Sequence, residues 1–322
     1  NPGFCDLSGF DFSEKLAYIL HMSFLYYPNA LYTSKDFATG QVTQAPVVQK
    51  NVGGRFNPGN FGTYRIVLEL PEGQTYGISS YSAMYSQRLF INGTEYPSVG
   101  TPGETAEDTV PKTTHYTVYF TPETAETKVV IQFANLYYAD YGGILPAYIG
   151  TQDKIIARDA MAQQRVCLMA GCIFAGFLFS LGIFVFFRKR HSFFWFSLIC
   201  LMTGLRIMAI EEKAIMLLIP NLPWALSIGL EYISLIMLVF SFLMYINSMF
   251  PGALCRAVLW ALGALCAVYT TVVLLTPPII YTRYIVYYEC ITALFGIYVV
   301  TTLLYHTMYK KLNLQVEHHP VF

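Results

Sequence analysis

Charge is scarce in this chain. Lys, Arg, Asp and Glu together make up 12% of the 322 residues, whereas a soluble domain carries about 25%. Hydrophobic residues make up 55%, and the mean hydropathy is +0.44. This composition excludes an intrinsically disordered chain and a nucleic-acid binder that works through bulk positive charge. It also indicates that the chain is not wholly soluble.

Cysteine is nearly missing from the first half. Cys5 is the sole cysteine before residue 165, so that half cannot form an internal disulfide. The six others lie in apolar runs, where a free cysteine behaves as a small hydrophobe. No CxxC pair, GxSxG, HExxH, Walker loop or dinucleotide fingerprint occurs. We therefore expect no catalytic residues, no metal site and no cofactor.

The net charge of zero is the sum of two unlike halves. Residues 1–164 carry ten basic and 15 acidic residues, a net charge of −5, and the remainder carries a net charge of +5. Such an asymmetry usually means that the two halves occupy different environments.

Five apolar stretches follow Arg165, and each is close to the length that crosses a hydrocarbon core about 30 Å thick. They cover residues 166–187, 192–210, 225–250, 257–276 and 284–308. We predict a transmembrane bundle over residues 166–309, followed by a cytoplasmic loop or truncated end at 310–322.

Basic residues mark one expected side of the membrane. They follow the first and fifth spans and lie between the third and fourth, at Arg188, Lys189, Arg190, Arg256, Lys310 and Lys311. Since short cytoplasmic loops are rich in Lys and Arg, we expect the acidic first half outside the cytoplasm and the C-terminus inside.

Three ionisable residues lie within the expected spans: Arg206, Glu231 and Glu289. At a rise of about 1.5 Å per residue, they fall at a similar depth near the outer side. Intramembrane charges are costly and tend to pair inside a bundle. This predicts an Arg206–Glu231/Glu289 cluster that holds the bundle together or takes part in switching. The alternative is that each side chain snorkels separately to the headgroups.

Residues 1–150 show short strand patterns separated by turn residues, over 64–70, 76–81, 87–91, 115–121, 128–133 and 147–149. Asn92-Gly93 is a tight-turn signal. Strands at this spacing predict an antiparallel all-β sandwich. Residues 151–165 contain good helix formers and few breakers, so we expect a helical connector there.

An ordered series of motifs in the first half resembles a known family. The motifs are Leu7–Phe12, Tyr32–Phe37, Gly62–Arg65, Leu89–Gly93 and Ile131–Asn135, followed by Gly142-Gly143. Phe10 and Ser34 stand where the family usually has Trp and Pro. With a multi-span bundle directly after them, these motifs resemble the extracellular jelly-roll sensor of bacterial seven-transmembrane receptors with diverse intracellular signalling modules. The same strands are similar to the sugar-binding jelly roll of family 2 glycoside hydrolases.

The resemblance implies a galactose-binding-like jelly-roll sandwich followed by an α-helical transmembrane bundle in a bacterial inner (cytoplasmic) membrane. It also implies a carbohydrate or other small-molecule ligand outside, seven spans, and a cytoplasmic output module such as a histidine kinase or diguanylate cyclase. Because five spans are found, we interpret the chain as a fragment lacking two spans and the module, with a reduced relative as the alternative. Signalling bundles are commonly dimers, so a homodimer is a further expectation.

Sugar sites combine planar hydrogen-bonding groups with aromatic faces. The candidates here are Tyr85, Arg88, Asn135, Tyr137, Tyr138 and Asp140. The alternative is that these tyrosines pack over the end of the sandwich. We weigh three functions: a receptor that signals inward, a membrane-anchored glycan-binding or scaffold protein without signalling, and a transporter or membrane enzyme with an outer accessory domain.

Overall fold

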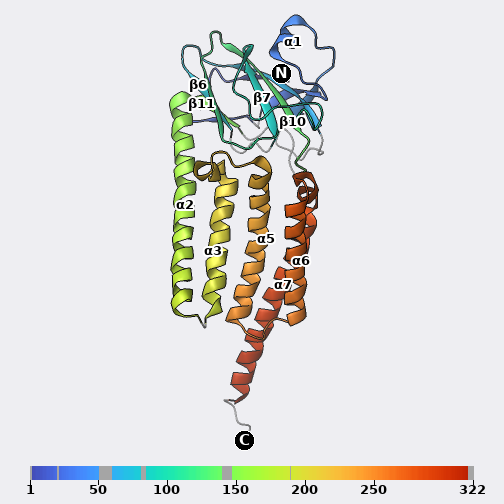
Figure 1. Cartoon of the computed structure of the whole chain (residues 1–322). Coiled ribbons are helices and arrows are strands. Elements are labelled where there is room, and N and C mark those ends of the chain that lie inside the picture. The colour runs from blue at the N-terminus through green and yellow to red at the C-terminus, as the bar shows by residue number, and fades with distance from the viewer. Residues whose placement is uncertain are drawn as a thin grey trace. The chain divides into compact units, whose positions relative to one another are not determined.

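The computed structural model describes residues 2–19, 22–50, 60–80, 85–139, 147–188 and 190–317. Within them the chain forms two β-sheets and then a run of long helices, coloured from blue to red along the chain in Figure 1. Contacts between residues divide the chain into two compact units. The first is Asn1–Leu168, Ile207–Ile228 and Pro277–Arg283, and the second is Met169–Arg206, Gly229–Thr276 and Tyr284–Phe322.

Two sheets make up the β-structure of the first unit. Among the described residues, the larger sheet has the strand order β4–β3–β5–β10–β7–β8, and β1 pairs in parallel with β5. Its strands are β1 (Phe4–Asp6), β3 (Ser23–Pro28), β4 (Val47–Lys50), β5 (Asn60–Glu69), β7 (Ser86–Ile91), β8 (Thr94–Glu95) and β10 (Glu126–Asn135). The smaller sheet has the order β2–β11–β6–β9. Its strands are β2 (Ala17–Tyr18), β6 (Tyr76–Ser80), β9 (Tyr116–Phe120) and β11 (Ala147–Thr151).

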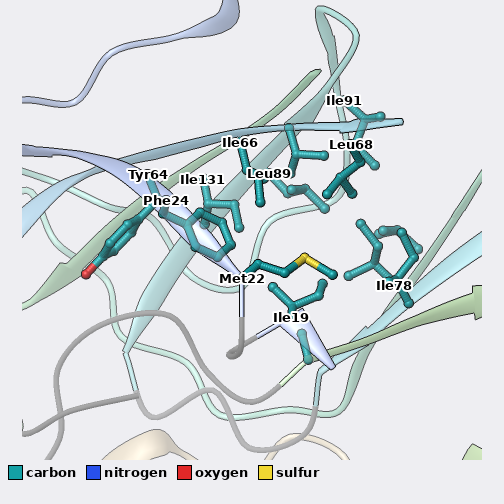
Figure 2. Close-up of a cluster of buried hydrophobic side chains, with 14 of the residues drawn as sticks. Ile19, Met22, Phe24, Tyr64, Ile66, Leu68, Ile78, Leu89, Ile91 and Ile131 are labelled. Atoms are coloured by element: carbon teal, nitrogen blue, oxygen red, sulfur yellow. The ribbon is translucent and has the colours of Figure 1, made fainter. Parts of the chain in front are cut away.

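The hydrophobic core lies between the two sheets. Tyr64, Ile66 and Leu68 of β5 are at most 1% exposed, whereas Arg65 between them is partly exposed. Since successive side chains of a strand point to opposite faces, this alternation places one face of β5 in the core. Figure 2 shows Ile66, Leu68 and Leu89 of the larger sheet facing the core that they share with Ile78 of the smaller sheet.

The expected antiparallel all-β sandwich is confirmed. Every strand pattern found in the sequence falls on a strand, and Asn92-Gly93 forms the turn between β7 and β8 with φ of +48° and +89°. Two positive φ values in a two-residue loop match the twist of a hairpin. The sequence patterns did not reveal the first four strands or the short helix α1 (Ser34–Thr39).

Within the described residues, five helices are long and apolar enough to cross a membrane, which confirms the expected helical region. They are α2 (Gln152–Phe186), α3 (His191–Ile210), α5 (Trp224–Met249), α6 (Arg256–Leu275) and α7 (Pro278–Glu317). Two short elements, η2 (Glu211–Lys213) and α4 (Ile215–Leu218), connect α3 to α5.

The helix ends differ from the predicted span ends. α2 begins at Gln152, among the residues of the expected connector. α7 begins at Pro278, before the expected start at residue 284, because proline suits the first turn of a helix. It reaches Glu317, through residues that were expected to form a loop. The sequence from Lys310 to Glu317 contains no glycine or proline that would stop a helix.

Candidate functional site

Four charged residues meet beside the smaller sheet. His115 directly precedes β9, Arg158 and Asp159 lie near the start of α2, and Glu212 belongs to η2. All four belong to the first compact unit. Their side chains are 7–19% exposed, so the charges are largely removed from solvent. We refer to His115, Arg158, Asp159 and Glu212 as the ion-pair cluster.

Each basic side chain of the ion-pair cluster contacts both carboxylates. His115 Nε2 lies 3.0 Å from Asp159 Oδ2, and His115 Nδ1 lies 3.2 Å from Glu212 Oε2. The two terminal nitrogens of Arg158 reach Asp159 Oδ1 at 2.8 Å and Glu212 Oε1 at 3.1 Å. With His115 protonated, two positive and two negative charges alternate around a closed ring. This mutual pairing offsets the cost of removing the charges from water.

The start of α2 is tied to three strands of the smaller sheet. Ser79 Oγ of β6 and Thr117 Oγ1 of β9 each donate a hydrogen bond of 2.8 Å to the Asp159 carboxylate. The Arg158 guanidinium lies 4.6 Å from the ring centroid of Tyr148 in β11, which is a cation–π contact. A movement of these strands would therefore act directly on α2.

The surroundings of His115 favour its charged form. Burial acts to lower its pKa, but hydrogen bonds and the negative charges of Asp159 and Glu212 outweigh burial and raise the pKa of His115 to about 9. Burial acts to raise the pKa of Asp159, but the donors around it, with His115 first, hold that pKa well below its usual range. Asp159 is therefore ionised and His115 protonated at neutral pH.

Glu212 reaches the ion-pair cluster from an unusual backbone conformation. Glu212 and Lys213 both have φ of +48°, a left-handed region that costs a non-glycine residue about 1–2 kcal/mol. Both residues are buried, at 7% and 1% exposure. Such strain persists where the surrounding contacts over-determine the conformation. The contacts of the Glu212 carboxylate with His115 and Arg158 are contacts of this kind.

Sequence reasoning missed the ion-pair cluster. It gave Arg158, Asp159 and Glu212 no functional role, and it placed His115 only at the start of the strand pattern 115–121. The residues that meet are far apart in the chain: His115 and Asp159 are separated by 44 in residue number, and Arg158 and Glu212 by 54. The available signal was the Arg158-Asp159 pair in a chain that is otherwise poor in charge.

We expect the first unit to lose stability as the pH rises from 6 to 10. The pKa of His115, about 9, lies above its ordinary value of 6.5, so its contribution is complete below pH 6.5 and disappears as the pH passes 9. The loss should be about 2 kcal/mol, allowing for partial solvent screening. Hydrogen exchange of the β6 and β9 amides, corrected for intrinsic rates, measures it. The control is His115→Gln, and identical pH profiles of the two proteins would contradict the prediction.

The structure places most of the candidate ligand residues in packing or polar contacts. Tyr85, Tyr138 and Asn135 are 2–3% exposed, and Asn135 Oδ1 accepts the backbone N–H of Tyr138 at 3.1 Å. Arg88 forms an ion pair of 3.3 Å with Glu95.

Two further candidates lie next to one another in the chain. The Tyr137 hydroxyl donates to the backbone oxygen of Ala106, and its ring centroid lies 6.2 Å from that of Trp224. Asp140 lies outside the described residues. A role of these six residues in ligand binding stays a prediction.

The intramembrane charges are brought together in part. Arg206 Nη1 donates to the backbone oxygen of Glu231 at 2.9 Å, which joins α3 to α5 in the second unit. Glu289 lies on α7 and is exposed. The three-residue charge cluster stays a prediction.

Comparison with known proteins gives one family match. A model of the family described as 7TM diverse intracellular signalling matches residues 166–313. No curated protein matches the chain.

The fold of the β-sandwich has distant likenesses among solved structures. A GH2 beta-galacturonidase from Eisenbergiella tayi bound to galacturonate is 10% identical, with a TM-score of 0.29 over 42% of this chain and 24% of that chain. A beta-glucosidase from Kluyveromyces marxianus in complex with glucose is 13% identical, with a TM-score of 0.26 over 44% and 18%. A family 35 carbohydrate binding module from Clostridium thermocellum is 11% identical, with a TM-score of 0.21 over 42% and 96%. The chain thus covers a quarter or less of each of the two glycosidases.

Proposed function

Because the chain belongs to the 7TM diverse intracellular signalling family, we propose that it is a receptor that senses an extracytoplasmic carbohydrate or related small molecule and signals inward. Residues 1–150 are the sensor, residues 151–165 the connector, and residues 166–309 the transmembrane bundle, with 310–322 on the cytoplasmic side. The receiving partner is a cytoplasmic output module such as a histidine kinase or diguanylate cyclase, and the chain works as a homodimer. The family is one of membrane sensors rather than of catalysts.

The observation that carries this proposal is the ion-pair cluster. It fixes Asp159, near the start of α2, to Ser79 and Thr117 of the sandwich. α2 then continues as one helix to Phe186, without a flexible Gly/Ser linker. A displacement of the sandwich strands on ligand binding therefore moves a stiff helix that enters the membrane.

The charge distribution supports the orientation of the receptor. The basic residues after the first and fifth spans belong on the cytoplasmic side, and the acidic first half belongs outside the bacterial inner membrane. Arg206, Glu231 and Glu289 are the proposed switching charges of the bundle, and the hydrogen bond from Arg206 to the Glu231 backbone supports the contact between α3 and α5.

Tryptophan fluorescence can test signalling because all three tryptophans lie in helices. Trp195 is in α3 and Trp260 in α6, both in the second unit, whereas Trp224 belongs to the first unit. The protein to use is the full chain with Trp224→Phe in lipid nanodiscs, where both remaining reporters lie outside the sandwich. A glycan array first selects a saccharide that binds.

We expect the saturating saccharide to shift the tryptophan emission of this variant. Insertion of four glycines between Gln164 and Arg165 should leave binding unchanged and abolish the shift, because it interrupts α2 after the ion-pair cluster. Binding without a shift in the uninterrupted chain would instead favour a membrane-anchored glycan-binding protein. A shift that survives the insertion would contradict transmission through α2.

A further inference from the structure

A groove of about 320 Å³ lies on the outer face of the larger sheet. It is lined mainly by Phe37, Arg65, Asn92, Glu126, Lys128 and Val130. Arg65 alternates with the core residues of β5 and therefore points away from the core. The volume falls within the range of sites that hold small ligands.

One wall of the groove is held rigidly by local contacts. Thr33 and Asp36 form a capping box at the start of α1, with hydrogen bonds of 2.7 Å from the Thr33 backbone and hydroxyl to Asp36. The Phe37 ring packs against Tyr27 and Tyr32, at centroid distances of 5.2 and 5.9 Å. These contacts fix Phe37 before any ligand arrives, which lowers the entropic cost of binding.

The segment that precedes α1 is also anchored to the larger sheet. Tyr32 donates its backbone N–H to Thr63 Oγ1 at 2.8 Å, and Thr63 donates to the Ala30 backbone oxygen at 2.7 Å. Gln132 of β10 donates to the backbone oxygen of Leu31 at 3.0 Å. The segment before α1 is therefore attached to β5 and β10, the two strands that supply Arg65 and Lys128.

The groove holds two positive charges and one negative charge. The Arg65 guanidinium lies 4.9 Å from the Phe37 ring centroid, which is a cation–π contact. Within the described part of the chain, neither Arg65 nor Lys128 forms an ion pair, in contrast to Arg88. Glu126 is the acidic member of the lining.

We infer that this groove binds the carboxylate-bearing ring of an acidic saccharide such as a uronic acid. The edge of Arg65 and the ammonium of Lys128 pair with the carboxylate, since a guanidinium edge matches a carboxylate in a bidentate manner. Glu126 accepts hydrogen bonds from hydroxyl groups of the saccharide. The Asn92 amide oxygen already accepts the Lys128 backbone N–H at 2.7 Å, so the Asn92 NH2 group donates to a further hydroxyl. Phe37 supplies apolar surface. Glu126 disfavours a doubly charged phosphate. The inference deepens the proposed function, because it gives the sensor a site and a ligand class.

The test measures binding of the full chain in nanodiscs to di- and trisaccharides of galacturonate and glucuronate. The neutral galactose and glucose oligomers of the same length are the comparison. We expect the acidic saccharides to bind and the neutral ones to bind at least about tenfold more weakly, because each charge-assisted hydrogen bond contributes about 1.5–3 kcal/mol.

Two variants locate the site. Arg65→Met and Lys128→Met should each weaken binding of the acidic saccharide by about ten- to a hundredfold, whereas Lys112→Met, an exposed cation outside the groove, should leave it unchanged. Lys128 is exposed, so its variant keeps the test valid if Arg65→Met fails to fold.

Equal binding of acidic and neutral saccharides, no binding of either, or full affinity in both groove variants would overturn the inference. Failure of the proposed function gives a different result. Acidic saccharides would then bind in the groove without shifting the tryptophan emission. Conversely, a ligand that shifts the tryptophan emission equally in the two groove variants and in the unchanged chain would support the receptor function. That result would show that the groove is not its ligand site.

Discussion

Replacement of Asp159 by alanine is expected to lower the free energy of unfolding of the first unit by about 3 kcal/mol. The change removes the carboxylate that accepts hydrogen bonds from Ser79, Thr117 and Arg158 and pairs with His115. Two positive charges then share the single carboxylate of Glu212. Removal of one partner from a buried ion pair costs more than the pair contributes, because uncompensated charge remains.

Hydrogen exchange of the β6 and β9 amides in the full chain measures this loss. The matched control is Asp153→Ala, an exposed aspartate in the first turn of the same helix, which should cost less than about 1 kcal/mol through the helix dipole. Equal losses in the two variants would show that the ion-pair cluster does not stabilise the attachment of α2 to the sheet.

The same substitution should also remove signalling. Asp159→Ala should leave saccharide affinity unchanged, because Asp159 is not among the groove-lining residues, and it should abolish the tryptophan shift. This combination separates transmission from binding. Retention of the full shift would mean that strand movement reaches the helices by another route.

Periodicity predicted the parts of the fold that local pattern determines. The alternation of polar and apolar residues along β5 is visible in the sequence because one face of that strand is buried in the core. The long apolar runs of α3, α5 and α6 are visible because each whole helix is apolar enough to cross a membrane. Strands as short as β1 and β2, which have three and two residues, carry too few positions for a period to appear.

The candidate sites were harder to predict because they depend on long-range strand pairing. His115 meets Asp159 only once β9 pairs with β6 and α2 returns beside both strands. Likewise, Arg65 and Lys128 line one groove because β10 pairs with β5 in the register that sets Val130 opposite Arg65. No residue spacing within a single strand or helix predicts these side-chain contacts.

Aromatic composition points to packing as readily as to sugar binding. Tyr85 was a candidate ligand residue, yet its ring centroid lies 6.2 Å from that of Phe133, inside the sandwich. Phe133 is fully buried and also packs against Tyr64 at 5.2 Å and Tyr26 at 6.1 Å. These four rings form an aromatic cluster across β3, β5 and β10 and next to β7.

Truncation of Phe133 to alanine should therefore destabilise the first unit by about 3–5 kcal/mol, through lost apolar burial and the cavity left among the rings. The measurement is hydrogen exchange of the β5 and β10 amides in the full chain. Phe133→Leu, which keeps most of the volume, should cost only about 1 kcal/mol. Similar costs for the two variants would indicate that the rings can close the cavity.

Tyr85→Phe then separates packing from ligand binding in the same aromatic cluster. Within the described residues the buried Tyr85 hydroxyl has no hydrogen-bond partner, so its removal should raise the free energy of unfolding by about 1 kcal/mol, because the hydroxyl loses its hydration on folding without compensation. If Tyr85 serves packing alone, saccharide affinity is unchanged, whereas a tenfold loss of affinity without a loss of stability would assign the hydroxyl to the ligand. Since the groove on the outer face of the sheet does not include Tyr85, unchanged affinity is the result that the structure favours.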